Sequence, residues 1–83
     1  MKTKLYTIRD RKSGIYGTPF GSYNDDTAIR DFKGFCNQAQ NVYLADDLEL
    51  YYVGYFESDT GEVFGSDKPE FLFSSVRGDA DNE

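Results

Sequence analysis

Polar and apolar residues alternate at the amino end of the chain in a way that predicts two β-strands. The first covers residues 4–9 (KLYTIR), and turn-forming residues follow at 10–14 (DRKSG). Residues 15–20 (IYGTPF) predict a returning strand, so the two would form a hairpin. Because Pro19 has no amide hydrogen to donate, we expect this second strand to be an edge strand or to end early.

A helix is predicted to begin after Asn24, which is a favourable N-cap residue. Asp25 and Asp26 follow in the first turn, where the helix dipole favours negative charge. Apolar residues then recur on one helical face, at Ala28, Ile29, Phe32, Phe35, Cys36 and Ala39. This pattern indicates a helix that lies across one face of a sheet.

The second half of the chain predicts another hairpin after a connector at 42–48. Residues 49–57 (ELYYVGYFE) are the strongest strand signal, residues 58–61 (SDTG) predict a turn, and residues 62–64 return. Lys68 and Pro69 interrupt the pattern before a last short apolar run at 71–73. The order ββαββ predicts an α+β fold: an antiparallel sheet of about four strands with one helix packed on one face.

Length and charge shape the domain organisation. With 83 residues the chain has room for a single core, and seven Phe and seven Tyr predict that this core is rich in aromatic rings. We expect one domain over residues 1–76 and a disordered acidic tail at 77–83. The net charge of −6 is unevenly spread, because residues 1–40 carry seven bases and four acids (+3) whereas residues 41–83 carry two bases and eleven acids (−9).

The sequence favours a cytoplasmic protein. It contains neither a run of about 18 apolar residues nor a signal-peptide-like start, so we expect no membrane association and no export. Cys36 is the single cysteine, and its place on the apolar helical face predicts a buried thiol in a reducing compartment.

Catalytic and metal-binding patterns are not found in the sequence. The chain has no His, Cys36 has no activating base in view, and residues 17–21 (GTPFG) lack the Gly-Lys-Ser/Thr ending of a phosphate-binding loop. The densest acidic group, Asp46, Asp47 and Glu49, lacks the spacing of a calcium loop. We therefore expect a binding protein that is not an enzyme and takes no cofactor and no metal.

Basic residues interleaved with aromatic residues near the amino end suggest a ligand. Cations that follow phosphates and exposed rings that stack on bases together grip single-stranded nucleic acid. If five cations form one positive face there, the predicted DNA-binding residues are Lys2, Lys4, Tyr6, Arg9, Arg11, Lys12 and Tyr16.

The strong strand at 49–57 leaves an alternative open. Tyr51, Tyr52 and Tyr55 cannot all face the helix, because neighbouring strand residues point to opposite faces. Displayed tyrosines also suit a protein partner. The chain could then be an interaction module that recruits or inhibits replication proteins without contacting DNA, and self-association as a homodimer is a further expectation for so small a domain.

Two motifs resemble a viral family. Residues 4–14 (KLYTIRDRKSG), Pro19-Phe20 and residues 24–32 (NDDTAIRDF) form the first, and residues 50–61 (LYYVGYFESDTG) form the second. Their order and spacing over residues 4–73 resemble the small nonstructural protein of gokushoviruses, which are single-stranded DNA microviruses. The resemblance implies a non-virion phage protein in the bacterial host cytoplasm, a DNA-binding role in genome replication or single-strand synthesis, and no enzymatic activity.

Overall fold

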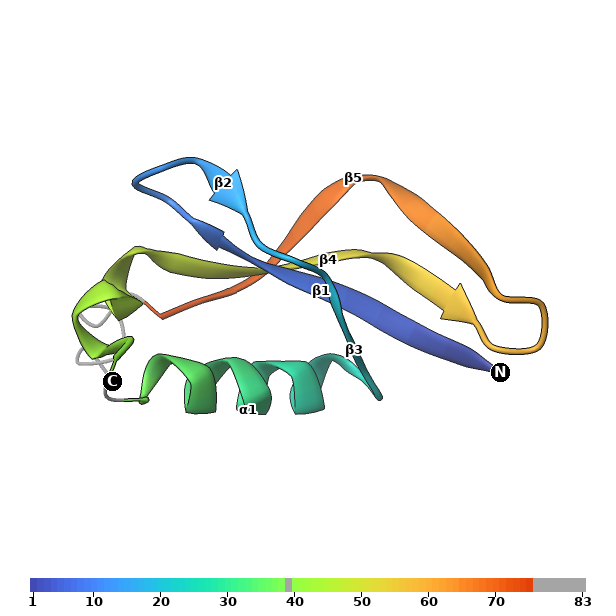
Figure 1. Cartoon of the computed structure of the whole chain (residues 1–83), viewed down its shortest axis with the longest axis horizontal. Coiled ribbons are helices and arrows are strands. Elements are labelled where there is room, and N and C mark those ends of the chain that lie inside the picture. The colour runs from blue at the N-terminus through green and yellow to red at the C-terminus, as the bar shows by residue number, and fades with distance from the viewer. Residues whose placement is uncertain (39, 76–83) are drawn as a thin grey trace.

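One helix lies beneath a curved antiparallel sheet (Figure 1). The computed structural model describes residues 1–38 and 40–75, and the tail predicted at 77–83 lies outside the described residues. The elements run β1 (Lys2–Asp10), β2 (Ile15–Tyr16), β3 (Phe20–Ser22), α1 (Asp25–Cys36), a 3-10 helix (Val42–Asp47), β4 (Leu48–Glu57) and β5 (Glu62–Ser74). The predicted α+β fold with one helix on an antiparallel sheet is therefore confirmed.

The strand order explains how both hairpins join into one sheet. The order is β2-β1-β4-β5, all neighbours are antiparallel, and β3 pairs with β1 on the side that also carries β2. The returning strand predicted at 15–20 is broken, because β2 and β3 are separated by residues 17–19. Pro19 lies in this break, where its missing amide hydrogen costs no ladder bond.

The helix begins where the sequence predicts. The Asn24 side chain accepts a hydrogen bond from the Thr27 amide at 2.8 Å, which satisfies one of the free donors of the first turn. The helix ends at Cys36, earlier than the predicted apolar face extends. One free carbonyl at the end of the helix is then satisfied by Asn41, whose side-chain amide donates a hydrogen bond to the Phe35 carbonyl at 2.9 Å.

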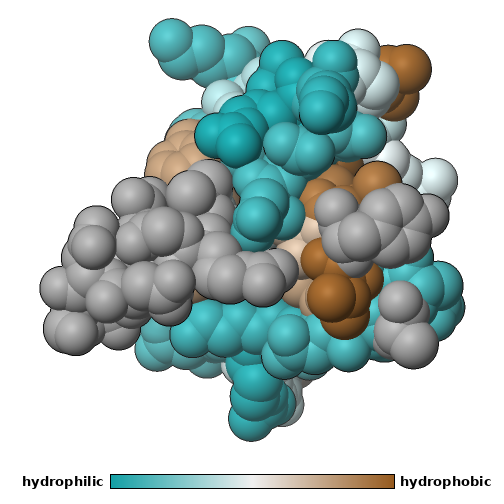
Figure 2. All heavy atoms as spheres, turned by 90° about the vertical axis from the view of Figure 1, so that its left-hand side faces the viewer, coloured by the Kyte–Doolittle hydropathy of each residue, from teal (hydrophilic) through white to brown (hydrophobic). Residues whose placement is uncertain are grey.

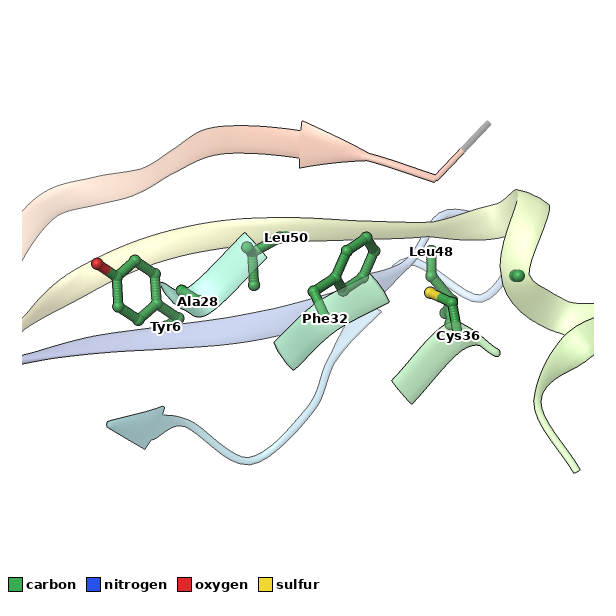
Figure 3. Packing of buried hydrophobic residues seen from close by; sticks show 7 residues of the cluster. Tyr6, Ala28, Phe32, Cys36, Leu48 and Leu50 are labelled. Carbon is green, nitrogen blue, oxygen red and sulfur yellow. The ribbon is translucent and has the colours of Figure 1, made fainter. Parts of the chain in front are cut away.

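The core is small and lies between α1 and one face of β1 and β4. Tyr6, Phe32 and Leu50 are its largest fully buried side chains. Phe32 meets Phe73 of β5 edge to face, with ring centroids 6.0 Å apart. Figure 3 shows Tyr6, Phe32 and Leu50 between the helix and the sheet, together with Ala28, Cys36 and Leu48.

The strand β5 is longer than predicted. The short strand predicted at 62–64 and the apolar run at 71–73 belong to one element, whose ladder with β4 is interrupted. Tyr52 pairs with Glu70 and Gly54 pairs with Gly65, so residues 66–69 lie opposite Val53 alone. Lys68 and Pro69 therefore do not end the strand, since a bulge on an edge strand tolerates them.

Candidate nucleic-acid interface

The predicted cations of the first hairpin do not share one face. Tyr6 is buried and faces the helix. Every second residue of a strand points to the same face, so Lys2 and Lys4, which lies opposite Tyr55 of β4, are also on the helix side of the sheet. Arg9 lies on the opposite side. The prediction of a single positive face is wrong, because two-residue periodicity divides one strand's side chains between two surfaces.

Carboxylates from distant parts of the chain pair with three of these cations. The Lys4 ammonium lies 3.5 Å from Asp25, the Arg9 guanidinium 3.3 Å from Glu49, and the Arg11 guanidinium 3.7 Å from Asp47. Arg11 also donates to the Asp46 carbonyl at 2.9 Å, which fastens the hairpin to the 3-10 helix. These pairs are partly exposed, so each stabilises the fold only slightly, but each lowers the local positive potential.

Lys2 and Lys12 differ from these three cations. The Lys2 ammonium lies over the Tyr55 ring, 4.6 Å from its centroid, near the start of β1. Lys12 is exposed in the turn, and within residues 1–38 and 40–75 its ammonium forms no ion pair. Lys12 is thus the cation of the hairpin that is freest to meet a phosphate.

Tyr6 cannot stack on a base. Its exposed fraction is 0%, and its phenol donates a 2.7 Å hydrogen bond to Asp25. Burial, together with this hydrogen bond, raises the pKa of Tyr6 well above its ordinary value. The assignment of Tyr6 to DNA binding is therefore corrected, because its aromatic ring belongs to the core.

The face of the sheet opposite the helix carries a row of aromatic side chains, Tyr16, Tyr51 and Phe71, which we call the aromatic row. The Tyr16 and Tyr51 rings meet edge to face at 5.3 Å, and the Tyr51 and Phe71 rings do so at 5.8 Å. The row crosses from β2 over β1 to β4 and β5. Tyr16 is 42% exposed and Phe71 is 57% exposed, so both ends of the row reach solvent.

Arg9 and Glu49 accompany the aromatic row. The Arg9 guanidinium lies 5.6 Å from the centre of the Tyr16 ring, and the Tyr51 phenol donates to Glu49 at 3.1 Å. Burial first, and then this hydrogen bond, raises the pKa of Tyr51. The Arg9–Glu49 pair leaves this part of the surface close to neutral and holds the rings in a defined arrangement.

A bulge in β4 decides which tyrosines are displayed. Tyr52 pairs with Tyr6 and Tyr55 pairs with Lys4, so both lie on the helix side, whereas Tyr51 lies on the opposite face. The prediction that these three tyrosines do not all face the helix is confirmed, because Tyr51 lies on the opposite face. Gly54 makes the bulge possible, because its φ is +144° and any Cβ at this position would collide with the Phe64 carbonyl oxygen.

A second surface feature lies on the helix side. A groove of about 910 Å³ separates the first hairpin from the later turns of α1, and its apolar walls come from Ile8, Ile15, Phe20, Phe35, Leu44 and Leu48. We call it the helix-side groove. Figure 2 views this end of the molecule and shows hydrophobic atoms at the surface between two hydrophilic regions.

Sequence reasoning missed Phe71 and Glu49 as members of the surface around Tyr16. Phe71 was visible only as part of a short apolar run, and the register with Tyr51 that brings it into the row depends on a bulge. Glu49 lies directly opposite Arg9 on the neighbouring strand. A search for cross-strand partners of each cation could have found Glu49 once the strand order was known.

The remaining reactive groups point to a structural role. Cys36 is buried, as predicted, and burial raises the pKa of its thiol, which disfavours the nucleophilic thiolate. In residues 1–38 and 40–75, no three His, Cys, Asp or Glu side chains converge as metal ligands would.

No helix in the described ranges has the length and apolar character needed to span a membrane.

Comparison with known proteins places the chain in a phage family. The family model described as "Phage ORF5 protein" matches residues 3–77, which include the sheet, the helix and both surfaces described above. No curated protein and no solved structure matched the chain. The chain belongs to the Phage ORF5 protein family.

Proposed function

We propose that this phage protein binds single-stranded DNA through the face of the sheet that α1 leaves uncovered. The observation that carries the proposal is the aromatic row, with Arg9 set against Tyr16. Unpaired bases stack on exposed aromatic rings with a gain of about 1–3 kcal/mol per base. The exposed ends of the row, Tyr16 and Phe71, are the stacking residues in this proposal.

The proposed role is that of a non-virion accessory protein in the bacterial host cytoplasm. The resemblance to the small nonstructural protein of gokushoviruses supports a task in genome replication or single-strand synthesis. Binding without catalysis suits a surface built from rings and one ion pair. The site proposed here keeps Arg9, Lys12 and Tyr16 from the sequence-based set and adds Tyr51 and Phe71.

The electrostatics of the site predict how its affinity depends on salt. Arg9 is engaged with Glu49, whereas Lys12, in the turn between β1 and β2, forms no ion pair among the described residues. A single strand contributes a slope of about −0.7 per phosphate contact in a plot of log K against log salt concentration. We therefore expect a shallow slope, since stacking rather than phosphate neutralisation provides most of the binding.

A titration of fluorescently labelled single-stranded oligonucleotide, followed by anisotropy at two salt concentrations, tests the proposal. We expect Tyr16→Ala and Phe71→Ala each to weaken binding by about 5-fold to 160-fold, the range that corresponds to losing one stacked base. Tyr23→Ala is the matched control, because Tyr23 is 85% exposed and lies outside the aromatic row. Absence of binding, or equal losses in the control, would refute the proposal.

A protein-interaction module is the second candidate function. The pairing of Lys4, Arg9 and Arg11 with carboxylates favours it, because these cations are less available to phosphates. Such a module would recruit or inhibit replication proteins without contacting DNA. Of the tyrosines predicted as anchors, Tyr51 lies on the uncovered face, whereas Tyr52 and Tyr55 lie on the helix side.

Lys12→Glu separates the two candidates. Arg11 is unsuitable for this purpose, because it braces the hairpin against Asp46 and Asp47. If DNA is bound at the uncovered face, Lys12→Glu should weaken binding at low salt, whereas Lys33→Glu on α1 should not. Absence of DNA binding in the unsubstituted chain would favour the interaction module, whereas DNA binding that is indifferent to Lys12→Glu, Tyr16→Ala and Phe71→Ala alike would overturn the proposed site.

A further inference from the structure

The two flanks of α1 have different surroundings: one packs against β5, and the other borders the helix-side groove. On one flank, Phe32 contacts Phe73, and the Lys33 ammonium lies 5.1 Å from the centre of the Phe73 ring, so the helix leans toward β5. On the other flank, Phe35 faces the helix-side groove rather than another strand. The groove therefore lies open beside α1 on this flank, between the helix and the first hairpin.

The core within one chain is incomplete at this position. Seven hydrophobic residues are buried in the described core. Around the groove, by contrast, Ile15 is 67% exposed, and Phe35 and Leu44 are each 39% exposed. Contiguous apolar surface of this kind on a small domain marks an interface, because burying it recovers hydrophobic free energy that a short chain lacks.

The shape of the groove favours a second copy of this chain as its occupant. An isologous interface needs a projection and a recess on the same patch, since the two copies must complete one another. The patch has both an apolar side chain that reaches solvent, Phe35 of α1 at 39% exposed, and a recess, the groove between α1 and Ile15. A two-fold axis across this patch sets each Phe35 against the groove of the other copy.

The charges at the rim of the groove are also self-complementary. Arg30 lies on the rim with Asp10 and Asp31, so the same patch carries both signs. A chain with a net charge of −6 repels its own copies over most of its surface. A rim of mixed sign lets Arg30 of one copy approach an aspartate of the other, whereas a purely acidic rim would not.

We infer that the helix-side groove is the interface of a homodimer in which each copy fills the groove of the other with Phe35. This inference does not rest on the proposed function: Tyr16 borders both surfaces, but Tyr51 and Phe71 of the aromatic row do not line the groove. The dimer leaves Tyr51 and Phe71 of each aromatic row on its outside, because neither lines the groove.

Sedimentation velocity over about a hundredfold range of protein concentration, without DNA, tests the inference. We expect a concentration-dependent dimer that Phe35→Glu and Ile15→Glu, made separately, each weaken by at least about tenfold, the cost of losing one anchor residue. Arg30→Glu should weaken the dimer at low salt and less at high salt. Val63→Glu is the control, because Val63 is 65% exposed on β5 and does not line the groove.

Circular dichroism establishes that each variant is folded, and Ile15→Glu keeps the test valid if Phe35→Glu disturbs the helix. A chain that stays monomeric at every concentration overturns the inference, and so does a dimer that only Val63→Glu weakens. Loss of DNA binding in an otherwise dimeric protein would count against the proposed function alone.

Discussion

The phenol of Tyr6 donates a hydrogen bond to the carboxylate of Asp25 across 2.7 Å, and this contact ties the middle of the sheet to the first turn of α1. Asp25 also lies 3.5 Å from the Lys4 ammonium and sits where the helix dipole favours an anion. One carboxylate thus serves three favourable interactions. The contact explains why a tyrosine rather than a phenylalanine occupies a fully buried position.

Replacing Tyr6 by Phe should lower the free energy of unfolding by about 1 kcal/mol, which is the usual net contribution of a hydrogen bond and less than the roughly 1.5–3 kcal/mol typical of one to a charged group. The cost is modest because the Asp25 side chain is 46% exposed and regains water. Urea denaturation measures it. The control is Asp26→Asn, which changes the same helical turn without touching Tyr6; a loss in Tyr6→Phe no larger than its own error would contradict the role given to this hydrogen bond.

Tyr6 should also make the protein less stable in alkali. Its pKa is raised in the folded state, so its contribution to stability is fully present below the unfolded tyrosine pKa of about 10 and is lost as pH rises above that value. Ultraviolet titration of tyrosinate should show one tyrosine that ionises only with unfolding. In Tyr6→Phe this late component should disappear; its persistence would assign it to another tyrosine.

Gly54 and Gly34 make a matched pair for a backbone test. Gly54→Ala should destabilise the fold by several kcal/mol, because its φ is +144° and the added Cβ would collide with the Phe64 carbonyl oxygen. Gly34→Ala should stabilise it by about 1 kcal/mol, since alanine is the better helix former, and a Cβ at Gly34 meets nothing within 4 Å. In thermal denaturation, the melting temperature should fall in Gly54→Ala and rise in Gly34→Ala; an unchanged or higher melting temperature in Gly54→Ala would contradict the role given to Gly54.

Asn24→Ala should cost about 1 kcal/mol of stability, the usual loss when an N-cap side chain is removed. The reason is that the Asn24 side chain accepts both from the Thr27 amide at 2.8 Å and from the Thr27 hydroxyl at 2.9 Å. Asn24→Asp should retain most of the stability, because a carboxylate accepts the same bonds. Urea denaturation of the two variants measures the difference, and equal losses would argue against capping.

Local signals made the fold predictable. The cap at Asn24 and the apolar spacing that follows depend on residues close in sequence, and the helix begins accordingly at Asp25. The two hairpins were predicted for the same reason, since their turns contain Gly14 and Gly61, both of which have positive φ. The ends of the elements were less predictable. The returning strand predicted at 15–20 is divided around Pro19 into β2 and β3, whereas β5 continues through the bulge at residues 66–69.

The site was less predictable, because it depends on pairings between distant segments. The residues next to Arg9 in the sequence do not predict its ion pair with Glu49, and those next to Lys4 do not predict its ion pair with Asp25. Strict alternation would also place Tyr52 and Tyr55 on opposite faces, whereas the bulge between Tyr52 and Gly54 puts both on the helix side. Such a shift of register is set by the backbone freedom of Gly54 and by the neighbouring strand.

The interrupted ladder at residues 66–69 limits how this protein can grow into larger assemblies. A straight, unbroken outer strand would offer its free amides and carbonyls as a template on which further chains could add, ending in fibres. Here the outer strand bends away where Asp67, Lys68 and Pro69 lie, and proline has no amide hydrogen to offer. Edge-to-edge addition at β5 is therefore disfavoured, and the two broad surfaces of the sheet remain as places where closed complexes can form.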